Sequence, residues 1–258
     1  MSVLVCFHAH PDDEVFSTGG TMRSAADAGH RVVLVTATDG ALGEYPDGLL
    51  AAGESLTSRR RDELETSAEL LGAHRLVMLG YPDSGMAGTP ENQNPSAFAN
   101  VSVDHVAQRL AEILVDEGAD VMTIYDSNGG YGHPDHIQVH HVGRRAAEIA
   151  GTAHVFESVV NRDHMRKLIE ARPDWDGEDS SVDIDSFGVP ADQITVALDV
   201  GDQIEVKRAA MVAHASQIGD FGPFLEMPTD ELRMAFGVEW YSRVGSAPTE
   251  LMETGLPL

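Results

Sequence analysis

Residues 3–14 read VLVCFHAHPDDE, an apolar run followed by a proline and three acidic residues. The run Val3–His8 is rich in β-branched and apolar side chains, which is typical of a strand buried on both faces of a sheet. Proline followed by Asp and Glu often begins a helix, because carboxylates are stabilised in the first turn. The stretch therefore predicts a strand followed at once by a helix, and we expect that helix to run to about Ala28.

The rest of the chain repeats this alternation of strand and helix signals. Further strands are expected at Arg31–Thr36, Arg75–Leu79, Asp120–Tyr125, His154–Val160 and Gln193–Leu198. Helices are expected over residues 57–71, over Val103–Glu117, after Pro134 and in a segment ending near His214. Crossovers of this length predict right-handed βαβ units and a mostly parallel sheet. The expected fold class is α/β, a Rossmann-like three-layer fold with helices flanking the sheet.

The length of 258 residues suits a single α/β domain over residues 1–258. We expect a Rossmann-like core over residues 1–160 and a C-terminal portion, 161–258, that completes the sheet and the pocket. Two stretches lack regular patterns. The loop Gly80–Asn100 is rich in Gly, Pro and Asn, and loops of this length are often functional. The segment Pro173–Asp192 holds seven acidic residues and no Lys or Arg, which indicates a solvated acidic insertion.

The charge balance excludes several classes of partner. Seventeen Lys and Arg against 42 Asp and Glu give a formal charge of −25. Nucleic acids and anionic membranes need a basic surface, so neither is expected as a partner. There is one cysteine, which excludes an intramolecular disulfide, and there is no apolar run of membrane-spanning length or basic leader, so we expect a cytoplasmic protein. The acidity fits either simple solubility or adaptation to salt.

Histidines concentrate in two segments that each follow a predicted strand. The first is HAHPDDE at residues 8–14, and the second is YGHPDH at residues 131–136. One His-Pro-Asp segment alone would fit a helix start with a capping carboxylate. Two such segments at the carboxyl ends of parallel strands are expected to converge, because ligands bind at that edge of an α/β sheet. Histidines and carboxylates gathered there have the composition of a catalytic zinc site with an open position for water.

The spacing suggests roles for individual side chains. His10 and Asp13 are close enough to chelate one ion, with His136 as the third ligand, and Asp12 is then available as a general base. His133, one helical turn from His136, is a candidate for a general acid or for stabilising an oxyanion. Asp135 is placed to hold an imidazole in one tautomer.

Three further side chains are open to two readings. His8 is either a core residue or a partner of the ligands, and His214 is either a packed histidine or a site residue. Cys6 is either a space-filling core residue or a ligand, and the first is expected.

The two motifs together, HAHPDDE and GHPDH, resemble the LmbE-like or PIG-L family of zinc-dependent deacetylases, which remove acetyl groups from N-acetylglucosaminyl conjugates. The segment around Arg60 and Glu63 is similar to an arginine-bearing helix of the family. The segment Asp83–Gly88 is similar to a substrate loop of the mycothiol-pathway enzymes. The resemblance covers the chain from Val3 to about Gly151, and more loosely residues 214–217.

The resemblance also implies which residues bind the metal, transfer protons, polarise the carbonyl and bind the substrate. It implies His10, Asp13 and His136 as zinc ligands, Asp12 as the general base and His133 as the acid or electrostatic partner. It further implies that the phenol of Tyr131 polarises the amide carbonyl. Arg60 and Asp83 would contact sugar hydroxyls, and Met86 would also bind the substrate. Asp83 has an alternative reading as part of the turn at residues 82–85.

The expected function is therefore zinc-dependent removal of an acetyl group from an N-acetylated amino sugar, for example an N-acetylglucosaminyl inositol. The alternatives are an amidase on mycothiol S-conjugates and a deacetylase of another glycoconjugate or antibiotic. A metal-binding module without catalysis is disfavoured, because Asp12, Tyr131 and His133 are all present. Fe²⁺ is compatible with the same ligands. The expected partner is a small-molecule acetylated amino sugar, and a homo-oligomer is left open.

Overall fold

Strand β1 (Val3–His8) is completely buried and lies inside the sheet. Its side chains alternate between two hydrophobic clusters, with Val5 and Phe7 on one face and Leu4 and Cys6 on the other. Cys6 is therefore a core residue, as expected. The structure is a computed structural model and describes residues 1–171, 187–249 and 251–258.

Seven strands form one mixed sheet. They are β1, β2 (Arg31–Thr38), β3 (Arg75–Tyr81), β4 (Val121–Tyr125), β5 (His154–Val159), β6 (Val196–Asp199) and β7 (Val238–Arg243). Their order is β3-β2-β1-β4-β5-β7-β6. The first five strands are parallel, and β7 runs antiparallel to both β5 and β6. The predicted mostly parallel α/β fold is confirmed.

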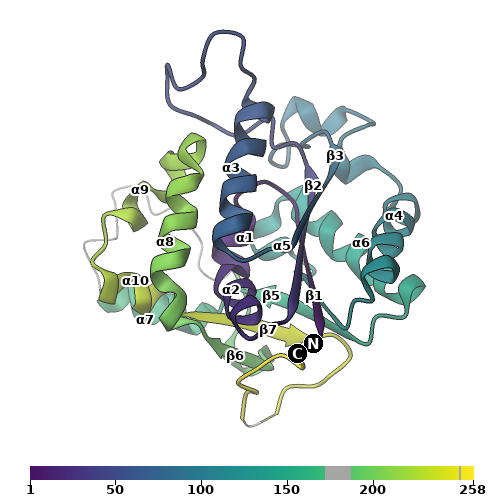
Figure 1. Ribbon diagram of the computed structural model, residues 1–258, viewed down its shortest axis with the longest axis vertical. Coiled ribbons are helices and arrows are strands. Elements are labelled where there is room, and N and C mark those ends of the chain that lie inside the picture. The colour runs from purple at the N-terminus through teal and green to yellow at the C-terminus, as the bar shows by residue number, and fades with distance from the viewer. Residues whose placement is uncertain (172–186, 250) are drawn as a thin grey trace.

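Helices cover both faces of the sheet (Figure 1). They are α1 (Asp13–Ser17), α2 (Gly19–Asp27), α3 (Leu56–Leu70), α4 (Val103–Glu117), α5 (Gly129–Gly132), α6 (Pro134–Ala150), α7 (Arg162–Ala171), α8 (Ile204–Ala213), α9 (Ile218–Leu225) and α10 (Thr229–Phe236). Helices α4 and α6 pack together on one face, and α2, α3 and α8 cover the other.

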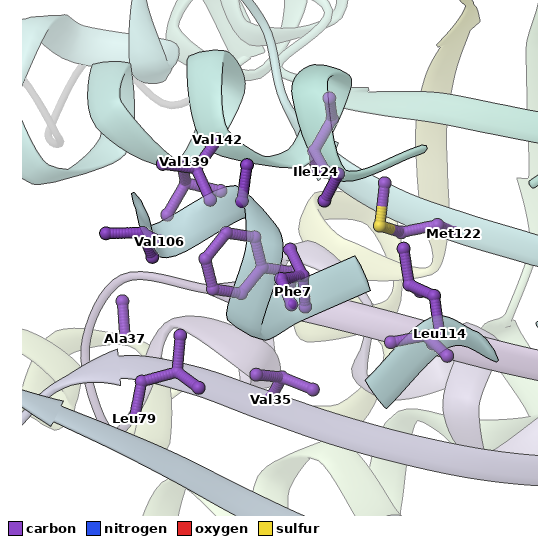
Figure 2. Packing of buried hydrophobic residues seen from close by; sticks show 14 of the residues in the cluster. Phe7, Val35, Ala37, Leu79, Val106, Leu114, Met122, Ile124, Val139 and Val142 are labelled. Atoms are coloured by element: carbon purple, nitrogen blue, oxygen red, sulfur yellow. The ribbon is translucent and has the colours of Figure 1, made fainter. Parts of the chain in front are cut away.

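One hydrophobic cluster fills the space between the sheet and the α4–α6 layer. Figure 2 shows Phe7 of β1 at its centre, between Val35 of β2 and Val106 and Val139 of the two helices. All four side chains are fully buried. The packing fixes the position of β1 relative to α6, and these two elements carry the two His-Pro-Asp segments.

The structure differs from the sequence-based expectation in three places. The helix predicted to run to Ala28 is broken at Thr18, whose φ of −145° is not helical, and forms α1 and α2. Strand β7 was not predicted, and neither were the helices α7, α9 and α10. The predicted strand Gln193–Leu198 is shorter and begins at Val196. Of the acidic segment Pro173–Asp192, residues 173–186 lie outside the described residues.

The strand order places a switch point beside β1. The chain moves from β1 to β2 and β3 on one side, and then returns to place β4 on the other side. In such sheets a crevice opens at the carboxyl ends of the two strands that flank the switch point. The segments after β1 and β4 meet at this edge. In the part of the chain that the structure describes, no helix is long and apolar enough to cross a membrane.

Candidate metal centre

The two His-Pro-Asp segments lie against each other at the carboxyl ends of β1 and β4. The ring of His10 lies 4.6 Å from that of His133 and 5.3 Å from that of His136, measured between centroids. All three rings are buried. His10 follows β1, whereas His133 and His136 begin α6. The convergence expected from the sequence is therefore present.

Asp13 contacts both of the predicted histidine ligands. Its Oδ2 lies 3.4 Å from Nδ1 of His10 and accepts a hydrogen bond from the His10 backbone N–H at 2.7 Å. Its Oδ1 lies 3.3 Å from Nε2 of His136. Burial alone would raise the pKa of Asp13, but His136 and His10 reverse that effect and hold it well below its usual range. Asp13 is thus an anionic group between two imidazoles.

The other ring nitrogen of His10 faces Asp135. His10 Nε2 lies 3.2 Å from Asp135 Oδ2, and Asp135 is fully buried. Ser84 fixes this carboxylate through its backbone N–H, at 2.9 Å, and through its hydroxyl. A carboxylate in this position keeps the proton on Nε2 and leaves Nδ1 to act as a ligand. Asp135 is therefore placed to set the tautomer of His10.

The donors present fit a metal ion. Nε2 of His136 is buried and forms no hydrogen bond among the described residues, although Asp13 Oδ1 lies 3.3 Å away; such a nitrogen is costly unless another group meets it. Two groups of donor atoms lie within 4.8 Å of one another: His10, His133 and His136, and His10, Asp83, His133 and Asp135. Asp13 belongs to neither group, although its Oδ2 faces His10 and its Oδ1 faces His136. The chain carries a His/Asp cluster able to bind a metal ion.

Asp12 adopts an unusual backbone conformation next to this cluster. Its φ is 122°, and no other residue except glycine has a positive φ in the described parts of the chain. Its backbone N–H donates to Glu14 Oε2 at 2.9 Å, and its Oδ2 lies 3.1 Å from Nη2 of Arg60. Burial raises the pKa of the Asp12 carboxyl to about 6, although Arg60 opposes this. A base with this pKa is suited to proton transfer near neutral pH.

Glu14 connects Asp12 to a buried polar network. Its Oε1 lies 2.7 Å from Nε2 of His214 and accepts a hydrogen bond from Ser67 Oγ at 2.5 Å. Glu14, Ser67 and His214 are all fully buried. His214 is therefore a packed histidine, and it also contacts the residue that holds the Asp12 backbone.

His133 caps α6. Its Nδ1 accepts a hydrogen bond from the backbone N–H of Asp135 at 3.1 Å, so the proton of the neutral ring is on Nε2. Burial and the neighbouring His10 and His136 lower the pKa of His133 to about 4. At neutral pH this ring can donate a hydrogen bond from Nε2 but carries no second proton.

Two tyrosines lie against His136. The ring of Tyr125, at the end of β4, stacks on His136 at 4.5 Å, and its hydroxyl lies 2.7 Å from Nδ1 of buried His8. His8 is thus a buried partner of the site, which it reaches through Tyr125. The ring of Tyr131 lies 5.0 Å from that of His136 and is 46% exposed. Tyr131 is accordingly open to a ligand at the centre.

Close approach of the backbone requires glycine before Tyr131. Gly129 has a φ of 61°, and a Cβ at this position would lie 2.5 Å from the Cβ of His136. The turn that carries Tyr131 can therefore pack on α6 only with glycine here.

The residues expected to bind the sugar lie in different surroundings. Asp83 is buried, its Oδ1 lies 3.7 Å from Nε2 of His10, and its pKa is lowered because His10 and the Gly85 N–H outweigh burial. Arg60 is also buried and donates to the carbonyls of Pro11 and Gly40, besides its contact with Asp12. Met86 is 47% exposed.

Sequence reasoning did not assign roles to three residues that support the centre. Ser84 holds Asp135, Glu14 holds Asp12, and Tyr125 stacks on His136. Glu14 and Tyr125 could have been suspected, since one belongs to the HPDDE motif and the other ends a predicted strand. Ser84 gives no such signal, because it lies in an irregular loop.

Comparisons with known proteins agree with this geometry. A family model described as GlcNAc-PI de-N-acetylase (PIG-L) matches residues 5–147. A deacetylase of Acidothermus cellulolyticus, named for 1D-myo-inositol 2-acetamido-2-deoxy-alpha-D-glucopyranoside, is 41% identical, over 92% of this chain and 87% of its own. The protein of the same name from Geodermatophilus obscurus is 37% identical, over 93% of this chain and 91% of its own.

A solved structure shares the fold. The N,N'-diacetylchitobiose deacetylase of Pyrococcus horikoshii superposes with a TM-score of 0.64 at 22% identity, over 94% of this chain and 84% of its own. The family match covers both His-Pro-Asp segments, strand β4 and most of strand β1. This chain belongs to the PIG-L family of de-N-acetylases.

Proposed function

We propose that the chain is a metal-dependent hydrolase that removes the acetyl group from an N-acetylated amino sugar, with an N-acetylglucosaminyl inositol as its substrate. The observation that carries this proposal is the contact of Asp13 with both His10 and His136, next to a base, Asp12, of raised pKa. The substrate follows the name shared by relatives that are 41% and 37% identical over nearly the whole chain.

His10, Asp13 and His136 would hold the ion, which we propose is zinc. His10 would bind through Nδ1, since Asp135 engages Nε2. When bound, zinc supplies Lewis-acid polarisation of the amide carbonyl and a lowered pKa for water. Ferrous iron accepts similar donors, and metal analysis decides between the two.

Asp12 moves the protons of the reaction. As a carboxylate it takes a proton from the attacking water, whose oxygen forms a bond to the carbonyl carbon. When the C–N bond breaks, Asp12 returns that proton to the nitrogen, and the products are acetate and the free amine. Arg60 and Glu14 hold Asp12 in place, from its side chain and its backbone respectively.

Tyr131 and His133 are the proposed donors to the oxyanion. The phenol of Tyr131 is partly exposed beside His136, and the neutral ring of His133 carries its proton on Nε2. Donors fixed in advance at the developing charge are among the largest contributions to catalysis. The lowered pKa of His133 favours this role over that of a general acid.

Asp83, Arg60 and Met86 are the proposed sugar contacts. Asp83 lies at the edge of the centre and retains its charge, so it can accept hydrogen bonds from hydroxyls. Arg60 is already engaged by Asp12 and by backbone carbonyls, so its main effect on the substrate is through Asp12. Met86 offers an exposed apolar contact in the same loop as Asp83.

The test is acetate release from N-acetylglucosaminyl inositol by the purified protein, with elemental analysis of the same sample. We expect release that is lost with a chelator and restored by zinc. An Asp12→Asn variant should keep its metal and lose most activity, whereas Asp116→Asn on the exposed face of α4 should behave as wild type. Acetate release that continues in the presence of the chelator, or that the Asp12→Asn variant retains, would contradict the proposal.

A further inference from the structure

An apolar cavity of about 340 Å³ adjoins the metal centre. Its walls come from the end of β5, from α7 and from the α10–β7 segment, with Met165, Phe187 and Trp240 among them. Its volume is more than twice that of an apolar cavity of roughly 150 Å³ that holds benzene. A sugar with many hydroxyls does not need such a space, so the cavity calls for an apolar ligand.

The cavity is preformed. Phe16, Phe224 and Phe236 pack against one another in its wall, with centroid distances of 5.6, 5.2 and 5.0 Å. The buried Lys207 Nζ donates to the backbone carbonyls of Phe16 and Phe236. An aromatic wall anchored in this way does not have to collapse when the cavity is empty.

Two polar side chains of the wall, Glu239 and Ser158, are already engaged within the protein. Glu239 forms a buried ion pair with Lys207, with 2.7 Å between Oε1 and Nζ. The hydroxyl of Ser158 donates to the carbonyl of Ser17 at 3.1 Å. Neither group is then available to solvate a hydrophilic ligand, which strengthens the case for an apolar one.

The cavity opens on one side of the metal centre. Asp13, Tyr131 and His136 contribute to its walls. Of the described residues that line it, none is Asp12, Arg60 or Asp83. The proposed base and the proposed sugar contacts Arg60 and Asp83 are therefore outside the walls of the cavity.

The geometry of an amide assigns its two ends to these two sides. The carbonyl carbon carries the nitrogen with its sugar on one side and the acyl chain on the other. Asp12 must reach the nitrogen to protonate it, so the sugar lies on the side of Asp12 and Asp83. The acyl chain then points away from Asp12, past Tyr131 and His136, toward the cavity.

We propose that this cavity is an acyl-chain subsite, and that the enzyme hydrolyses N-acyl amino sugars with straight acyl chains of up to about six carbons as well as acetyl. This inference rests on the proposed function, since it needs the amide carbonyl at the metal centre. The reaction is the same hydrolysis, which yields a longer fatty acid and the free amine.

The test uses a series of methyl glucosaminides with N-acetyl, N-butyryl and N-hexanoyl groups. The rate at which each releases its free amine is measured. We expect kcat/KM for the hexanoyl substrate within about tenfold of that for acetyl. Binding is measured separately by calorimetry on the Asp12→Asn variant, which leaves the substrate intact. Since burying each methylene favours binding by about fourfold, the hexanoyl compound should bind at least tenfold tighter than the acetyl compound.

Variants that fill the cavity test where the chain lies. Ala235→Phe on α10 and Met165→Trp on α7 each place a large side chain in the cavity. Each should lower the ratio of hexanoyl to acetyl turnover by at least tenfold. The control is Met234→Phe, at the neighbouring position, whose side chain is exposed and does not line the cavity. It should leave the ratio as in wild type.

Three results would overturn the inference: hexanoyl turnover more than tenfold below acetyl turnover, hexanoyl binding no tighter than acetyl binding, or an unchanged ratio in both filling variants. A hexyl glycoside of N-acetylglucosamine whose turnover falls in Ala235→Phe would place the aglycone in the cavity and also overturn it. If no substrate is hydrolysed, the proposed function fails, and the calorimetry still decides whether the cavity binds an acyl chain.

Discussion

The carboxylate of Glu14 accepts a hydrogen bond from the backbone N–H of Asp12, with 2.9 Å between Oε2 and the nitrogen. Asp12 has a φ of 122°, a conformation that costs an L-residue about 1–3 kcal/mol and persists only where the surroundings enforce it. Ser67 and His214 hold the other oxygen of Glu14. The strained base is thus fixed by a buried network that reaches from α1 to α3 and to the residue after α8.

Glu14→Gln tests this network. Each oxygen of Glu14 faces a donor, so the amide NH₂ of glutamine would face a donor in either orientation. We expect kcat to fall at least about tenfold, a rise of about 1.4 kcal/mol in the barrier, with KM and metal content little changed. Steady-state kinetics and elemental analysis check this. Glu65→Gln on the exposed face of α3 is the control, and a wild-type kcat in Glu14→Gln would show that Asp12 does not depend on Glu14.

The acidic limb of the pH profile of kcat/KM tests how the charge of Arg60 affects Asp12. Burial raises the pKa of Asp12 to about 6 against the lowering effect of Arg60. A base acts only when deprotonated, so kcat/KM falls as the pH drops through this pKa. In Arg60→Gln the lowering effect is absent, and the limb should move to higher pH, by on the order of one pH unit. Arg60→Lys keeps a charge and should shift less, whereas a limb that moves to lower pH in Arg60→Gln would exclude Asp12 as the titrating base.

Much of this arrangement could be predicted from the sequence. The largely apolar runs Val3–His8 and Asp120–Tyr125 predicted the two strands, and the His-Pro-Asp segments that follow predicted the edge where they meet. The alternation of strand and helix was enough to place His10 beside His136, because parallel strands end at one edge. Both the fold and the core of the candidate site could therefore be predicted from strong local sequence patterns.

The remaining features depend on contacts that leave no local pattern. Strand β7 was missed because the charged Glu239 is buried beside the core residue Tyr241, which breaks the usual alternation of buried apolar and exposed polar positions. Ser84 supports Asp135 only because an irregular loop folds onto α6. His214 could not be assigned, because its partner Glu14 is 200 residues away in the sequence.

Tyr131→Phe tests the proposed oxyanion donor. The variant removes only the hydroxyl, and loss of one such donor costs about 10²–10³ in kcat. Metal content should stay as in wild type, because the ring still packs beside His136. Tyr45→Phe is a matched control, since Tyr45 is 46% exposed like Tyr131. Loss of metal in Tyr131→Phe would instead assign Tyr131 to metal binding.

Lys207→Met tests the buried ion pair behind the cavity. Lys207 and Glu239 are almost completely buried, and Glu239 also accepts hydrogen bonds from the N–H groups of Gly20 and Thr21 at the start of α2. Removing the cation leaves a buried charge without its partner, which should lower the free energy of unfolding by about 3–5 kcal/mol. Urea denaturation measures this. Lys167→Met, which changes the other lysine of the chain at an exposed position, should unfold as wild type, and equal midpoints for both variants would contradict the account.

The most direct test of the central claim is the metal content of His136→Ala compared with His141→Ala on the same helix. His136 is buried and its Nε2 has no hydrogen-bond partner among the described residues, whereas His141 is exposed. After loading with zinc and removal of free metal, we predict one ion per chain in wild type and in His141→Ala, and almost none in His136→Ala. A full complement of metal in His136→Ala would contradict the assignment of His10, Asp13 and His136 as the metal site.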